Sequence, residues 1–146
     1  MMSKMRRWRL PIAFGLFVIM GAFIVRHIWA RQARQKREAG YYSVLRSYSA
    51  DLKPGLRRSE VESYLHARNL TIRQMCCVDS KEFRAGVWDD LVKIGSENAP
   101  WFCSENNVYI AFHFAGQRSQ GHTQWDAEGT DELAALSVYH WLEKCL

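Results

Sequence analysis

Apolar residues follow three patterns along this chain, and each pattern predicts a different kind of element. Residues 10–25 form an unbroken apolar run of 16 positions. Between residues 41 and 69 apolar positions recur every three or four residues, which is the period of an amphipathic helix. From residue 70 onward they alternate with polar ones, which is the period of a strand. The order predicted is an apolar segment, then helices, then strands.

The apolar run predicts a membrane anchor over residues 1–30, with the lipid bilayer as its partner through residues 10–30. Basic residues flank the run on both sides, and Trp8 and Trp29 bracket it as interfacial aromatics would. A spanning helix needs about 20 residues, so we expect Arg26 to extend its side chain to the interface. A cleaved signal peptide ending at Ala30 is the alternative, but Ile28 stands where a small residue is required.

The next ten residues, 31–40, are basic and strongly helix-forming, and they predict a helical stalk that Gly40 interrupts. The remaining residues, 41–146, predict one folded domain. The short N-terminal tail favours an orientation with the N-terminus inside. We therefore expect a single-pass protein of the bacterial inner membrane whose C-terminal domain faces the periplasm.

Two helices and four strands are expected in the domain. Residues 41–52 form one apolar helical stripe, and residues 59–69 form a second helix with Ser59 and Glu62 in capping-box spacing. Alternation predicts strands at 70–78, 90–95, 108–114 and 136–142. Without β-α-β alternation, this order predicts an α+β fold: a single transmembrane helix, followed by two helices packed on an antiparallel sheet of about four strands.

Charge divides sharply between the two parts of the chain. Residues 1–40 hold nine basic residues and one acid, for +8, whereas residues 41–146 hold eleven basic and fourteen acidic residues, for −3. The folded part lacks the net basic character that phosphate contacts require, so no nucleic acid is expected as a partner.

Four cysteines predict two disulfide bonds in an oxidising compartment. Cys76 and Cys77 are adjacent on a predicted strand, so their side chains point to opposite faces and should not pair with each other. Two pairings remain: Cys76 with Cys145 and Cys77 with Cys103, which is narrowly preferred, or the reverse. The histidines show no metal-ligand spacing, and neither a metal nor another cofactor is expected.

Little else in the sequence carries chemistry. Asp89 and Asp90 are interpreted as a strand-entry turn, His113 as a solvent-facing strand residue, and His140 as a core histidine. No nucleophile-elbow, phosphate-loop or dinucleotide motif occurs, so no enzymatic activity is expected. Two long loops carry large aromatic residues, which we interpret as partner-binding positions: Trp101, Phe102 and Trp125.

The segment LKPGLRRSEVESYL, at residues 52–65, is similar to the helix entry of the small lipoprotein subunit of the outer-membrane barrel-assembly machinery and of related inhibitor-like domains. The order of helices and strands is similar as well. The chain departs from that family at Arg57, where a small hydroxyl residue is usual, and no lipobox cysteine precedes Cys76. The resemblance implies two helices leading into an antiparallel sheet.

These patterns lead to one expected function and two alternatives. The expected function is that of a non-enzymatic cell-envelope protein whose disulfide-bonded periplasmic domain binds a protein partner, as an accessory or assembly factor. The first alternative is an inhibitor or immunity-like protein that blocks a hydrolase or toxin, since an acidic domain with aromatic loops suits a basic active site. The second alternative is an enzyme whose catalytic residues lie on loops.

Overall fold

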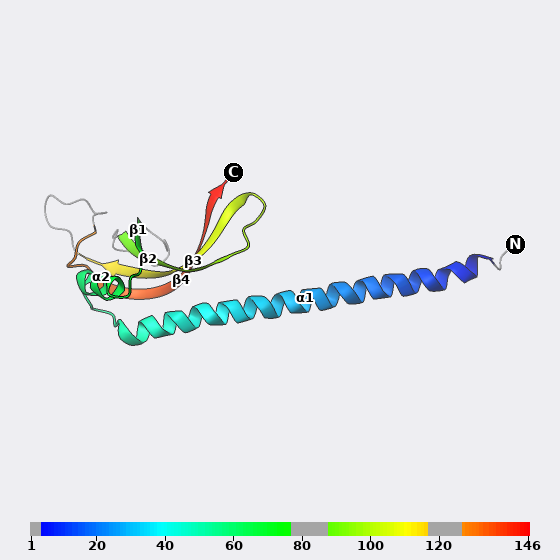
Figure 1. Cartoon of the computed structure of the whole chain (residues 1–146), viewed down its shortest axis with the longest axis horizontal. Helices are drawn as coiled ribbons and strands as arrows, with labels where there is room; N and C mark the ends of the chain where they lie inside the picture. Colours follow the sequence, from blue (N-terminus) through cyan, green and yellow to red (C-terminus); the bar gives the residue numbers. More distant parts are fainter. Residues whose placement is uncertain (1–3, 77–87, 117–126) are drawn as a thin grey trace. The chain divides into compact units, whose positions relative to one another are not determined.

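The computed structural model describes residues 4–76, 88–116 and 127–146. Residues 4–14, 16 and 76 are described by their backbone alone. Its elements run in the order α1, α2, β1, β2, β3, β4 (Figure 1). The chain divides into two compact units, residues 1–40 and residues 41–146.

Helix α1 is a single continuous helix, Lys4–Asp51, of 48 residues. The predicted interruption at Gly40 is therefore wrong. A glycine inside a helix costs only about 1 kcal/mol relative to alanine, and the strong helix formers before it outweigh that cost. The stalk predicted at 31–40 and the helix predicted at 41–52 are thus parts of one element.

The predicted membrane span is overturned by the structure. No helix in the described residues contains a stretch both long enough and apolar enough to cross a bilayer. The apolar run has 16 residues where about 20 are needed, and Arg26 follows it directly. The predicted fold class is wrong in its transmembrane helix, and the predicted location as a single-pass inner-membrane protein is wrong with it.

Helix α2 is a short helix, Arg58–His66. It begins one residue earlier than predicted, so the capping pair is not Ser59 with Glu62. The Arg57 backbone N–H instead donates to the Glu60 carboxylate at 2.8 Å, which satisfies a donor at the helix start. Val61 and Leu65, one turn apart on the same stripe, are fully buried.

The four predicted strands are all present. They are β1 (Ile72–Cys76), β2 (Trp88–Glu97), β3 (Cys103–Ala115) and β4 (Glu132–Cys145). Each pairs antiparallel with the next, in the order β1-β2-β3-β4. The folded unit is therefore α+β, with β1 and β4 at the edges of the sheet.

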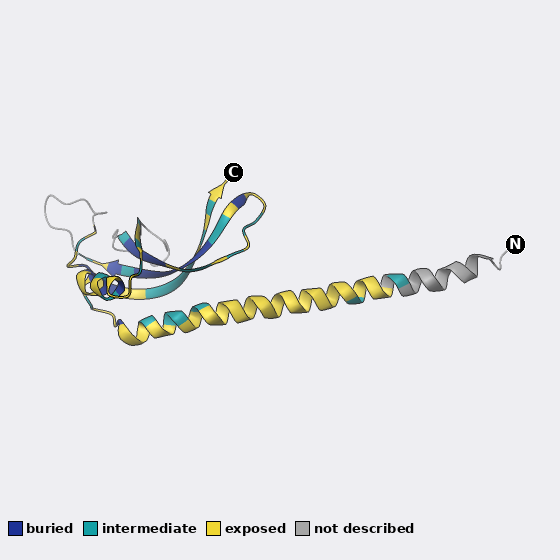
Figure 2. Ribbon diagram, in the orientation of Figure 1, coloured by how far each residue is buried: buried dark blue, intermediate teal, exposed yellow. Residues whose placement is uncertain are grey.

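The main core lies between one face of the sheet and the helices. Figure 2 shows the buried positions concentrated in the strands and α2. Alternate residues of β3 point into this core, as predicted, and meet the last turns of α1 and the apolar stripe of α2. The buried members are Leu52, Val61, Leu65, Val92, Ile110, Phe112, Phe114 and Leu133.

The opposite face of the sheet, which we call the second face, is also apolar at its centre. Leu91 and Ala111 are fully buried there, and Tyr109 is nearly so. Met75, Tyr139 and Trp141 pack around them. Alternation in β3 places Tyr109 and Ala111 on the side away from the main core, and they are nevertheless buried because large side chains on β1 and β4 cover the centre of this face.

A buried ion cluster joins α2 to the sheet. The guanidinium of Arg58, which is 1% exposed, contacts Asp90 at 2.5 Å and Asp131 at 3.4 Å, and lies over the ring of Phe114 at 3.9 Å. Burial raises the pKa of Asp90 to about 7, although the Arg58 charge opposes this shift. The cluster also corrects the interpretation of Asp89 and Asp90 as a turn: both lie inside β2 and are fully buried.

Candidate functional site

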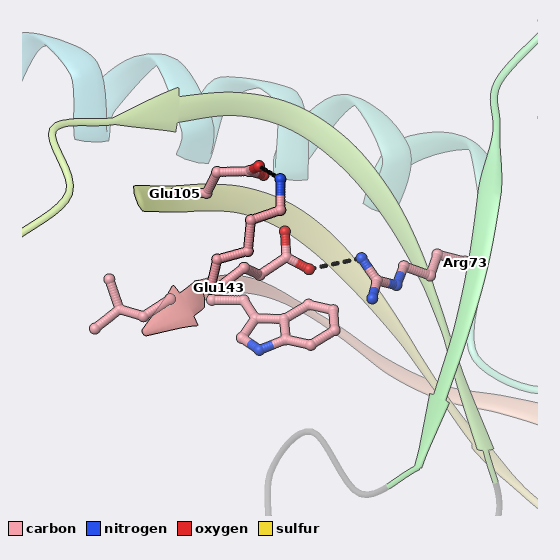
Figure 3. A pocket seen from close by; sticks show the side chains of 6 residues that line it. Arg73, Glu105 and Glu143 are labelled. Carbon is pink, nitrogen blue, oxygen red and sulfur yellow. Dashed lines mark hydrogen bonds and ion pairs between the residues drawn. The ribbon is translucent and has the colours of Figure 1, made fainter. Parts of the chain in front are cut away.

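An open hollow of about 540 Å³ lies where β3 begins and β4 ends. We call this region the distal hollow (Figure 3). One lining residue comes from β1, one from β3 and four from the end of β4, in chain order Arg73, Glu105, Trp141, Leu142, Glu143 and Lys144. It therefore unites residues that the sequence separates by up to 71 positions.

Arg73 and Glu143 form the centre of the hollow. The Arg73 Nη1 lies 2.6 Å from the Glu143 carboxylate, and the Arg73 guanidinium sits 4.2 Å from the centre of the Trp141 ring. The other Glu143 oxygen accepts a hydrogen bond of 2.5 Å from the amide of Asn107, which is 3% exposed. Because each group has at least two contacts, the arginine is held in place before any ligand arrives.

A second ion pair, between Glu105 and Lys144, closes another side of the hollow. The hydrogen bond from Lys144 lowers the pKa of Glu105, and the same bond raises the pKa of Lys144. Both shifts favour the charged forms, so this wall of the hollow carries one positive and one negative group at neutral pH.

A disulfide bond between Cys103 and Cys145 fastens β3 to β4 beside the hollow. The two cysteines are register partners, and the Leu146 N–H donates to the Phe102 carbonyl on the adjacent pair. Cys103 and Cys145 thus occupy a non-hydrogen-bonded pair, where opposite side chains come closest. The sequence analysis paired Cys103 and Cys145 each with Cys76 or Cys77, and both of these pairings are wrong because Cys103 and Cys145 bond to each other. Strand register decides which cysteines meet, and the sequence does not display it.

The other two cysteines are Cys76 and Cys77. Cys77 lies outside the described residues, and Cys76 ends β1 in the described backbone only.

Beside the disulfide, the turn between β2 and β3 exposes two aromatic rings. Trp101 is 91% exposed and Phe102 is 41% exposed, and their rings contact edge to face at 5.8 Å between centroids. Leu142 and the C-terminal Leu146 are exposed as well. We call these four residues the distal apolar tip. Of the predicted partner-binding residues the structure describes Trp101 and Phe102; Trp125 lies outside the described residues.

A hydrogen-bonded row on the second face escaped the sequence analysis. His113 on β3 contacts Asp89 on β2 through Nδ1 at 3.1 Å and Ser137 on β4 through Nε2 at 2.7 Å. His113 was expected to face solvent, but its side chain is only 16% exposed, and Asp89 is fully buried. Three separate strands supply the row, so only the strand register could have revealed it.

The other histidine also departs from expectation. His140 lies on the core side of β4 but is 43% exposed, and its ring meets Tyr41 of α1 edge to face. It is therefore a peripheral residue, not a core histidine. Within the described residues no group of three or more His, Cys, Asp or Glu side chains gathers as a metal site.

Comparisons with known proteins add no assignment: no family model, no curated protein and no solved structure matches this chain. The resemblance to the barrel-assembly lipoprotein therefore stays a prediction. The candidate sites are the distal hollow with its apolar tip, which can bind, and the Asp89–His113–Ser137 row, which can exchange protons.

Proposed function

We propose that the folded unit, residues 41–146, binds a protein partner through the distal apolar tip and the adjoining distal hollow. The observation that carries this proposal is Trp101, a tryptophan with 91% of its surface exposed beside a second exposed aromatic ring. Large apolar side chains clustered on a surface favour association, and tryptophan is the residue most enriched among energetically dominant interface contacts.

The tip is also rigidly anchored, which favours binding. The Cys103 N–H donates to the Pro100 carbonyl at 2.9 Å and closes the turn that carries Trp101 and Phe102. The disulfide to Cys145 then fixes the base of the turn. A surface that is ordered before binding loses less conformational entropy on association, so each buried ring contributes more to affinity.

The charge of the folded unit indicates the kind of partner. Its net charge is −3, while the ion pairs of the distal hollow balance each other. We therefore propose a partner that offers an apolar pocket for Trp101, surrounded by a surface of net positive charge. An accessory or assembly factor is the first form of this function. An inhibitor or immunity-like protein is the second, favoured by the acidic character of the unit.

Photo-crosslinking tests the proposal in the cells that produce the protein. Benzoylphenylalanine replaces Trp101 in one full-length variant and Tyr42 in a control variant. Tyr42 is an aromatic residue of α1 that is 53% exposed and distant in sequence from the tip. We expect a discrete heavier adduct from position 101 and none from position 42.

Competition makes the result specific. An excess of unlabelled wild-type protein should abolish the adduct, whereas the same excess of a Trp101→Ala/Phe102→Ala variant should not. An adduct of equal strength at positions 101 and 42, or competition by the double variant as effective as that by wild type, would show that the tip is not the binding surface.

A further inference from the structure

The row Asp89–His113–Ser137 has the connectivity of a nucleophile, a base and a group that orients the base. Both contacts lie within hydrogen-bond reach: 2.7 Å between the Ser137 hydroxyl and His113 Nε2, and 3.1 Å between His113 Nδ1 and Asp89. The three residues sit on the adjacent strands β4, β3 and β2. Strands of one sheet hold such a row more firmly than loops do, and rigid placement is what a reacting group requires.

With an ionised Asp89 and a neutral His113, hydrogen-bonding rules give one direction for each proton in the row. An ionised carboxylate can only accept, so the Nδ1 of a neutral His113 carries the hydrogen and donates it to Asp89. The Nε2 of that tautomer has a lone pair and accepts from the Ser137 hydroxyl. The hydroxyl proton is therefore already directed at the atom that would remove it.

The edge position of β4 adds a donor beside the hydroxyl. The Leu146 N–H, directly after β4, donates inward to the Phe102 carbonyl on the β3 side, and the pairing of β4 with β3 keeps the same register from Cys145 back to Ala135. Alternate residues of a strand direct their backbone N–H to the same edge, so odd-numbered β4 residues point away from β3. The Ser137 N–H thus points to the outer edge of the sheet, next to its own hydroxyl.

We infer that Ser137 is an activated nucleophile that attacks the carbonyl carbon of carboxylic esters. In the acylation step the Ser137 Oγ–carbon bond forms, the hydroxyl proton moves to His113 Nε2, and the carbonyl oxygen becomes an oxyanion beside the Ser137 N–H. The ester carbon–oxygen bond then breaks, and the leaving alcohol takes the proton from His113. Water reverses these transfers, releasing the carboxylic acid and restoring the serine.

The geometry favours esters over amides. One backbone donor beside the serine gives the oxyanion limited stabilisation, since each such donor contributes about 10²- to 10³-fold in rate. An ester, with its better leaving group, needs less help than an amide. This esterase activity goes beyond the proposed binding function and uses different residues. An experiment can therefore refute the esterase activity without refuting the binding function, and the reverse.

Covalent labelling of the full-length protein tests the inference directly. A fluorophosphonate probe is added to wild type, and the modified residue is located by mass spectrometry of peptides. We expect one phosphonyl group per chain, on Ser137, and no labelling after denaturation in guanidinium. Ser104 is the matched control: an exposed serine of β3 whose hydroxyl contacts only a backbone carbonyl, at 3.5 Å, among the described residues.

Substitutions separate activation from simple exposure. His113→Gln should slow the labelling of Ser137 by at least about 100-fold, the size of a general-base contribution, while Ser104→Ala should leave the rate unchanged. p-Nitrophenyl acetate should release about one equivalent of nitrophenol in a burst that Ser137→Ala abolishes. Labelling of Ser137 in native wild type no faster than that of Ser104 would overturn the inference, even if a variant failed to fold.

Discussion

Replacement of Arg58 by methionine should destabilise the protein more than any surface change of the same kind. Methionine fills a similar volume but removes the positive charge from between Asp90, 0% exposed, and Asp131, 1% exposed. Loss of one partner from a buried ion pair costs about 3–5 kcal/mol, because the remaining charge stays buried without compensation. That is a large part of the roughly 5–15 kcal/mol by which domains are stable.

Urea unfolding of the full-length chain, followed by circular dichroism at pH 8, measures this effect. The pH lies above the pKa of Asp90, about 7, so its carboxylate is ionised in the folded state. With an m value of about 1.5 kcal/mol/M, the loss moves the midpoint down by about 2–3 M. Arg68→Met is the matched control, because the Arg68–Asp51 pair is about half exposed and should contribute at most about 1 kcal/mol.

A second substitution separates the charge from the volume of the side chain. In the Arg58→Met background, Asp90→Asn removes one of the uncompensated charges, so it should recover more than about 1 kcal/mol. In the wild-type background Arg58 offsets part of the cost of burying the Asp90 charge, so the same change should recover less than it does in the Arg58→Met background. If Arg58→Met costs no more than Arg68→Met, or if Asp90→Asn has the same effect in both backgrounds, the buried ion cluster does not stabilise the fold as argued.

Three other predictions follow from the same structure. Burial raises the pKa of Asp90 above its unfolded value of about 3.8, so the contribution of Asp90 to stability is full below pH 4 and is lost as pH rises through 7. The difference in unfolding free energy between wild type and Asp90→Asn should therefore change across that window, by at most about 1.4 kcal/mol per pH unit. A difference that does not depend on pH would contradict this prediction. Reduction of the Cys103–Cys145 bond, which spans 42 positions, should lower stability by about 2–4 kcal/mol, whereas the Cys103→Ala/Cys145→Ala variant should show no such response at this site. Gly95→Val should cost about 1–3 kcal/mol, since even a Cβ at Gly95 lies 3.1 Å from the Tyr41 ring; equal stability would mean that the ring moves aside freely.

The sequence predicts the elements of the fold well but not the lengths of its helices. Strand alternation located all four strands and the inward residues of β3, because a half-buried strand must alternate. Local propensity is weak evidence for boundaries, and Gly40 illustrates this: it was expected to end a helix that continues through it. The 16-residue apolar run was likewise assigned a membrane span that α1 does not support in the described residues.

The candidate sites depend on strand register, and the sequence contains no direct record of register. The cysteines at 103 and 145 meet because β3 and β4 pair over a long ladder, while the adjacent cysteines had seemed to require distant partners. The Asp89–His113–Ser137 row depends on the same ladders. Exposure of Trp101, by contrast, could be predicted, since a polar loop with large aromatics favours a binding surface.

The central claim, that the distal apolar tip binds a protein, is tested most directly by an affinity. Once crosslinking from position 101 has identified the partner, calorimetry compares its Kd for wild type with that for Trp101→Ala and for Tyr42→Ala. A buried tryptophan anchor contributes 2 kcal/mol or more, so we expect Trp101→Ala to weaken binding by about 30-fold or more and Tyr42→Ala to leave it unchanged. A change of less than about twofold for Trp101→Ala, with the same fold and stability, would contradict the account.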